Sequence, residues 1–382
     1  MEKLPANDPV TSTKQKIVYL DHVKVLMTVL VILHHTVITY GGPGGWYYRH
    51  PATSKVPVLL MTLFVSTNQA FFMGLFFLLS AYFVEPSLRR KGPARFTVDR
   101  LKRLGIPLLF YSFIFSPVLI FLVYRYGEGH NVTFMQFLGG FDGWINFGVL
   151  WFAAALLLFT LTFTLGFAGK LTGHAAISRL TTGKIIVFAL ALGAVSFLVR
   201  LVFPVGWVLK PVGFQLGHFP QYIAMFVVGI MASRGRLAAH LDLRLGKRFA
   251  WMAGIIILVV FPLLGLLLAV YHHPGTYFNG GWRVESLVYS FYEQLLGISI
   301  MVALTAISRH KWNQPSAFMA KLSRGAFAAY IFHPLVVIGL SLLLRGLNHP
   351  LLELAIVAPL AVVLTFVLAG LIVKILVVKN II

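Results

Sequence analysis

The sequence predicts an all-α, polytopic membrane protein with about ten transmembrane helices, and three observations lead to this fold class. Of the 382 residues, 58% are hydrophobic and only 11% are charged, and the mean hydropathy is +0.85. Long apolar stretches recur along the chain, and about 20 apolar residues are what a helix needs to cross a bilayer. The basic residues gather in the short connections between these stretches. A soluble domain does not combine these features.

The ten predicted spans are apolar runs that end at charged or glycine-rich connections. They cover residues 19–40, 56–84, 106–126, 147–167, 185–203, 222–233, 249–271, 286–307, 326–344 and 351–378. The second run has room for a short interfacial segment at its start, and the sixth is short unless it begins near Phe214. We expect a single transmembrane domain, residues 17–382, after a tail of residues 1–16 without the pattern of a cleavable signal peptide.

The basic residues also predict how the spans are oriented. With the N-terminus inside, 24 of the 32 Lys and Arg residues fall in or beside inner connections and only five in outer ones. Positive charge concentrates on the cytoplasmic side of membrane proteins. We therefore expect a multi-pass protein of the cell membrane with both termini cytoplasmic. Membrane lipid rather than nucleic acid then accounts for the net charge of +21.

The chain contains no cysteine. Disulfides, a thiolate nucleophile and a cysteine-based metal site are therefore excluded. The spacing of the His, Asp and Glu residues is not that of metal ligands, so no metal site is expected.

The first span carries several ionisable residues, among them Asp21, Lys24, His34 and His35, and such residues in a membrane helix usually mark a function. Lys24 and His35 lie only about 20° apart around the helix and about 16 Å apart along it, while His34 points roughly 100° away. Asp21 lies near the same stripe as Lys24 and His35. The alternative is structural: Lys24 extends to the membrane surface and His35 bonds a neighbouring helix.

Lys24, ten intervening residues and His35 resemble the Arg-x10-His signature in the first membrane helix of the acyltransferase 3 family. Asp21 lies where that family often has an aspartate. Lys24 departs from the signature, because it keeps the charge of arginine but loses the planar, bidentate fork.

The basic connection after the second span extends the resemblance. RFTVDRLKRLGIP (residues 95–107) is similar to the family's Arg-x-x-Arg motif, with Arg100 and Arg103 on one helical face. Two guanidinium groups at a membrane entrance suit phosphate. Upstream, FFMGLFFLLSAYF (residues 71–83) resembles the family's Phe-rich helix end, with Ala81 where glycine is usual.

Four further residues leave two interpretations each. Trp46, in the Gly-rich loop after the first span, suits a membrane-interface belt or a platform for a sugar. GVLWF resembles another family motif, although Trp151 in it also suits simple packing. His333, in a segment resembling the family's Ser…Tyr…His-Pro pattern, either caps the carbonyl that Pro334 frees or lines a cavity. Glu293 is a candidate partner for His35 or for an arginine, or half of a structural ion pair.

The resemblance covers most of the chain and implies a membrane O-acyltransferase. It would move an acetyl or succinyl group from cytoplasmic acyl-CoA to a hydroxyl of an envelope or extracellular carbohydrate, most like the glucan-modifying, succinyl-transferring branch. We expect His35 to be the catalytic base, with Asp21, Lys24 and Glu293 in the catalytic set. Lys24, Arg100 and Arg103 would bind acetyl-CoA or succinyl-CoA. The acceptor-side residues would be Trp46, Trp151 and His333.

Two other classes of protein remain open at the level of the sequence. In a proton-coupled secondary transporter, Asp21, Lys24, His35 and Glu293 would form a relay. The second is a membrane protein of envelope assembly without catalysis. The acyl group, the acceptor and the oligomeric state are not determined by the sequence.

Overall fold

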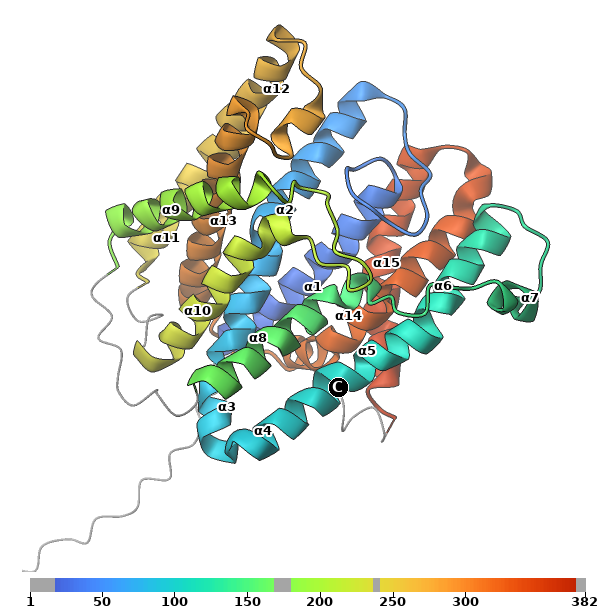
Figure 1. Ribbon diagram of the computed structural model, residues 1–382, viewed down its shortest axis with the longest axis horizontal. Helices are drawn as coiled ribbons and strands as arrows, with labels where there is room; N and C mark the ends of the chain where they lie inside the picture. Colours follow the sequence, from blue (N-terminus) through green and yellow to red (C-terminus); the bar gives the residue numbers. More distant parts are fainter. Residues whose placement is uncertain (1–17, 168–179, 236–240, 376–382) are drawn as a thin grey trace, which may run out of the picture.

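The fold is a bundle of ten helical spans long and apolar enough to cross a membrane, seen in a computed structural model that describes residues 18–167, 180–235 and 241–375 (Figure 1). Within these residues the only β-pairing is an isolated bridge between Leu209 and Phe214, and no strand is present. The prediction of an all-α, polytopic membrane protein is therefore confirmed.

The first half of the bundle contains five spans. They are built from α1 (Val18–Thr39), α2 (Lys55–Tyr82), α3 (Val84–Lys91), α4 (Pro93–Arg100), α5 (Ile106–Phe110), α6 (Ser116–Leu122), the short loop helix α7 (Phe134–Gly139), α8 (Trp151–Phe167) and α9 (Thr182–Arg200).

The second half supplies the other five. They are α10 (Phe219–Gly235), α11 (Leu243–Ile255) with α12 (Phe261–Val270), α13 (Val284–Lys311), α14 (Ala317–Leu344) and α15 (Pro350–Ile372). Single 3₁₀ turns precede α8 and α10, at Gly148–Leu150 and Leu216–His218. The sixth span thus begins at Leu216, close to the earlier of its two predicted starts.

In the part of the chain that the structure describes, two spans contain π-helical turns, and three of these four turns end two residues before a proline. The third span runs continuously from Pro93 to Gly127 through π segments at Leu101–Gly105, Tyr111–Phe115 and Val123–Gly127, with Pro107 and Pro117 after the first two. The segment Ile256–Val260 precedes Pro262 in the same way. Proline lacks an amide hydrogen and clashes with the preceding turn, which a wider turn relieves.

Three predicted boundaries were wrong, and in each case the helix continues past the apolar run. The second span is one unbroken helix from Lys55, without a separate interfacial segment. The third begins at Pro93 and therefore includes both Arg100 and Arg103. The ninth begins at Ala317, so Ser323 is helical. Hydropathy marks where a helix is inside the membrane, whereas the backbone hydrogen bonds continue into the polar zone.

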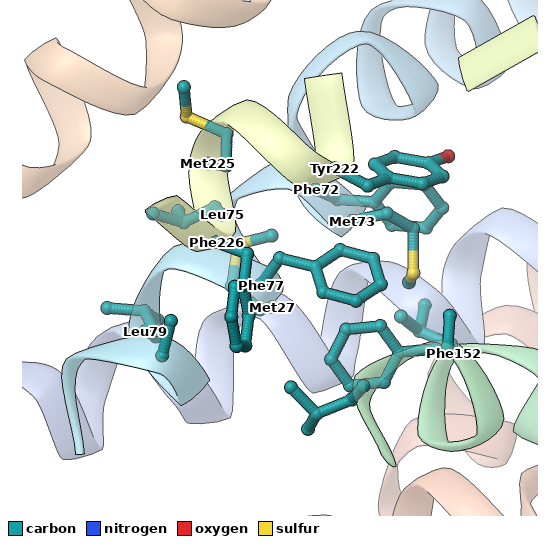
Figure 2. Packing of buried hydrophobic residues seen from close by; sticks show 14 of the residues in the cluster. Met27, Phe72, Met73, Leu75, Phe77, Leu79, Phe152, Tyr222, Met225 and Phe226 are labelled. Atoms are coloured by element: carbon teal, nitrogen blue, oxygen red, sulfur yellow. The ribbon is translucent and has the colours of Figure 1, made fainter. Parts of the chain in front are cut away.

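The largest part of the core lies between α1, α2, α8 and α10 (Figure 2). Phe77 of α2 packs against the rings of Phe152 and Tyr222, with centroids 4.6 and 5.1 Å away. At the C-terminal end of α2, small residues let the backbones of α2 and α10 come close together. A Cβ on Gly229 of α10 would lie 2.7 Å from Cβ of Ala81. Small residues at such crossings allow membrane helices to pack tightly.

Helices α1 and α14 lie side by side near the centre of the bundle (Figure 1). Contacts between them occur at two levels, because Asp21 meets Ser323 and His35 meets His333. Both residue numbers increase from one level to the other, so the two helices run in the same direction.

Candidate functional site

The glycine-rich loop after α1 folds back onto the helix that it follows. Its backbone returns to the helix end, since the amide of Gly42 donates to the carbonyl of Val37 and that of His50 to the carbonyl of Thr39. Gly44 has φ +136°, and a Cβ there would lie 2.8 Å from Ile38. Only glycine adopts this conformation in this space.

Two side chains hold the folded-back loop. The guanidinium of Arg49 donates to the carbonyls of Gly42 and Gly44, at 3.0 and 3.2 Å. His50 Nδ1 lies 2.9 Å from the buried carboxylate of Glu353 on α15. The loop is thereby fixed against the bundle rather than left projecting from it.

Because the loop folds back, Trp46 contacts His35 of the first span. The indole stacks on the ring of His35, with centroids 4.1 Å apart and an angle of 11° between the planes. On α14, His333 is also nearly parallel to His35, at 5.0 Å and 10°. The structure thus brings together three residues that the sequence placed in separate motifs.

The two histidines are joined by a hydrogen bond whose direction follows from Pro334. Proline donates no hydrogen bond to the carbonyl one turn earlier, which is that of Tyr330. His333 Nδ1 lies 2.8 Å from this carbonyl oxygen. A carbonyl only accepts, so Nδ1 of His333 carries the hydrogen and, in the neutral ring, Nε2 accepts.

His35 Nδ1 lies 2.8 Å from His333 Nε2 and is therefore the donor in this pair. The lone pair of neutral His35 is then on Nε2. No residue in the described part of the chain bonds that nitrogen, and His35 is only half-buried. This arrangement leaves an imidazole nitrogen of His35 with a free lone pair.

Tyrosine side chains lie next to the stacked rings, Tyr47 beside Trp46 and Tyr330 beside His333. Tyr47 and Tyr111 share a hydrogen bond of 3.0 Å, and Tyr330 donates to the carbonyl of Val149. Gly148 leaves room for this group, because a Cβ there would lie 2.2 Å from the Tyr47 hydroxyl. Burial raises the pKa of the Tyr47 phenol to about 12, so it remains protonated at neutral pH.

His34 has a different environment from that of His35. Its Nδ1 accepts from the side-chain amide of Asn68 at 3.3 Å, and its ring lies 4.9 Å from that of Phe72. The same amide also donates to the carbonyl of Leu30. His34 therefore ties α1 to α2.

The N-terminal end of α1 holds Asp21 and Lys24. Asp21 accepts a hydrogen bond of 2.6 Å from the hydroxyl of Ser323 on α14, and Lys24 Nζ lies 3.8 Å from the same carboxylate oxygen. The Lys24 side chain is 43% exposed. Eleven residues of helix, or about 16 Å, separate this end from His35.

Arg100 and Arg103 lie on either side of the start of a π segment, which gives them different environments. Arg100 is half-buried over the ring of Phe96, 4.8 Å from its centroid, whereas Arg103 is exposed. Neither forms an ion pair with a residue that the structure describes, unlike Lys91 with Asp99 and Arg89 with Glu85. Both guanidinium groups therefore have donors free for an anion.

Glu293 lies in a separate polar cluster between α9, α10 and α13. It pairs with Arg200, and Nδ1 of His218 is 3.3 Å from its other carboxylate oxygen. Arg200 also donates to Ser290 and to the carbonyl of Gly217. Of the two predicted partners, the structure thus provides an arginine rather than His35. Neither Arg200 nor His218 was predicted to belong to a site, although an arginine near the end of the predicted fifth span was a signal for a buried ion pair.

Trp151 also lies apart from the stacked rings. Its nearest aromatic neighbours are Tyr222 on α10, at 5.5 Å, and Phe152, at 6.5 Å. These contacts are those of a packed side chain at the start of α8.

Comparison with known proteins gives one match. The family model Acyl_transf_3, described as an acyltransferase domain, matches residues 17–374. No curated protein and no solved structure matches the chain.

Proposed function

This chain belongs to the acyltransferase family Acyl_transf_3, and from that premise we propose that it moves an acetyl or succinyl group from cytoplasmic acyl-CoA to a hydroxyl of an envelope or extracellular carbohydrate. As a family member it is a multi-pass membrane acyltransferase. The acyl-CoA donor, the carbohydrate acceptor and the orientation in the cell membrane are parts of the proposal.

The hydrogen-bonded chain from the Tyr330 carbonyl through His333 to His35 carries this proposal. An alcohol is a poor nucleophile at neutral pH and needs a base to attack a thioester. With its proton fixed on Nδ1, His35 presents Nε2 as that base. His333 accepts from Nδ1 and so acts as a positioning residue for His35, as an orienting group does in other nucleophile–base pairs.

Two routes use the same nitrogen of His35. In direct transfer, Nε2 takes the hydroxyl proton while the acceptor oxygen forms a bond to the thioester carbonyl carbon, and the proton then passes to the departing CoA sulfur. In the second route, Nε2 itself attacks the thioester carbonyl carbon and the C–S bond breaks, which releases the CoA thiolate. The acceptor oxygen then bonds to the acyl carbon, the bond to Nε2 breaks, and the hydroxyl proton passes to the CoA sulfur. A cysteine thioester is excluded in both, because the chain has no cysteine.

Arg100 and Arg103 are proposed to bind the phosphates of the donor. They lie in the first three turns of the third span, which begins at Pro93, and have no carboxylate partner in the described residues. Lys24 is exposed at the inner end of α1, on the stripe that leads to His35. The acyl-CoA would therefore enter along α1, with its thioester end leading toward His35.

The transporter alternative has no comparable support. It needs Asp21, Lys24, His35 and Glu293 in one relay, but Glu293 pairs with Arg200 and His218, and Nδ1 of His35 bonds His333.

The proposal is tested with the purified, detergent-solubilised protein. Acetyl-CoA or succinyl-CoA is supplied with glucan oligosaccharides, while CoA release and the acyl mass on the sugar are both measured. Acceptor-dependent CoA release with a matching mass increase supports the proposal. Failure with both donors, together with unchanged glycan masses in cells that lack the chain, contradicts it.

A further inference from the structure

The indole N–H of Trp46 is buried and has no hydrogen-bond acceptor among the described residues. Most buried donors in proteins have a partner, since leaving one unpaired loses its hydrogen bond to water without replacing it. Trp46, whose ring stacks on His35, therefore carries a buried donor that has no partner in the described part of the protein.

The position of this donor is fixed before any substrate binds. Trp46 packs against two hydrophobic clusters of the bundle, and the loop that carries it is held by Arg49 and by the contact of His50 with Glu353. Stacking on His35 leaves the edge of the indole, rather than that face, for contact with a ligand. A sugar could not stack on the face that His35 covers.

Resting on the proposed function, we propose that the Nε1–H of Trp46 donates a hydrogen bond to the oxyanion that forms during acyl transfer. When the acceptor oxygen bonds to the thioester carbonyl carbon, the electrons of the C=O double bond move to the carbonyl oxygen. His35 Nε2 holds the proton removed from the acceptor. When the C=O bond re-forms, the C–S bond breaks and the proton passes from His35 to the CoA sulfur.

The location of Trp46 suits this role. The reacting carbon must lie within about 3–3.5 Å of the atoms it reacts with, and His35 Nε2 must reach the proton of the attacking hydroxyl. The indole centroid is 4.1 Å from that of the imidazole, so Trp46 lies directly beside the proposed base. A fixed donor in a site with little water is the usual means of stabilising such charge.

The test removes the N–H and keeps the ring. Trp46→Phe is compared with wild type for kcat and for the KM of the acyl donor, with exposed Trp282→Phe as a matched control. A second variant replaces Trp46 with β-(3-benzothienyl)alanine, which keeps the shape of tryptophan but has sulfur in place of N–H. This variant maintains the test if Trp46→Phe does not fold.

We expect both Trp46 variants to lower kcat by about 10²–10³-fold, as for loss of one oxyanion donor, while the donor KM changes less than about threefold. A kcat within about threefold of wild type overturns the role of Trp46, and so does a change confined to KM of the acceptor. If wild-type protein itself transfers no acyl group, the proposed function fails instead, and the two failures are thus distinguishable.

Discussion

His35 Nδ1 lies 2.8 Å from His333 Nε2, although 298 positions separate the two residues in the sequence. The first and ninth spans meet at this point, directly beneath the loop that carries Trp46. Because Pro334 frees the carbonyl of Tyr330 that orients His333, the position of the proton on His35 follows from this hydrogen-bonded chain.

His35→Ala should lower acyl transfer by at least about 10²-fold, the low end for a positioned base. Binding of CoA should be largely retained, because the donor phosphates are expected about 16 Å away along α1. Turnover of acyl-CoA with an acceptor and equilibrium binding of CoA measure the two effects separately.

His34→Ala is the matched control on the same helix. Its contacts with Asn68 and Phe72 predict lower thermal stability and a much smaller effect on turnover. Near-normal transfer by His35→Ala, with His34→Ala inactive, would reverse the assignment of the base.

Pro334→Ala should reduce kcat about tenfold or less without unfolding the protein. Alanine restores an amide hydrogen that competes for the Tyr330 carbonyl, so the proton of His333 is no longer held on Nδ1. His333→Gln should retain more activity than His333→Leu, because only glutamine can accept from Nδ1 of His35.

Kinetics of these variants should show the change in kcat rather than in KM. Pro359→Ala, a proline inside α15, is the control for a general effect of removing a helix proline. Equal losses for the glutamine and leucine variants of His333 would leave it only a packing role.

Arg100→Ala or Arg103→Ala should each weaken CoA binding about tenfold or more, because a charge-assisted contact contributes about 1.5–3 kcal/mol. Lysine at either position should rescue binding only in part, since it lacks the bidentate fork. Titration calorimetry with CoA gives the affinities. Exposed Arg90→Ala in the same basic segment is the control, and unchanged affinity in the double alanine variant would remove both arginines from the donor site.

Glu293→Gln should destabilise the bundle by about 3–5 kcal/mol, the usual effect of leaving a buried charge unpaired. The unpaired charge is that of Arg200, whose side chain is fully buried. A double variant, Arg200→Met with Glu293→Leu, should unfold at a higher temperature than either single variant. A stable Glu293→Gln protein with turnover reduced 10²-fold would instead place Glu293 in the chemistry.

Reporter fusions after Lys91, Lys184, Arg248 and Lys311 should read as cytoplasmic, and fusions near Trp46 and Gly280 as external. We expect this because connections rich in Lys and Arg stay on the cytoplasmic side of a membrane. A cytoplasmic signal near Trp46 would move the stacked rings to the inner side and contradict an extracellular acceptor.

What the sequence by itself determined is local. Apolar length and charge give the ten spans and their predicted orientation, because a helix in lipid satisfies its backbone internally whatever its neighbours are. The 3.6-residue period puts Lys24 and His35 on one face. Pro334 frees a carbonyl one turn back through the covalent structure of proline, so a partner for His333 was foreseeable.

What only the tertiary structure decided is which helix faces which. Lipid is as apolar as the side chains, so helix pairing depends on close fit and on a few polar contacts that follow no sequence period. His35 thus finds its partner on α14, His34 finds Asn68 on α2, and Glu293 finds Arg200 on α9. The return of Trp46 onto His35 likewise depends on Gly44 packing against Ile38, a contact that appears only once the loop has folded back.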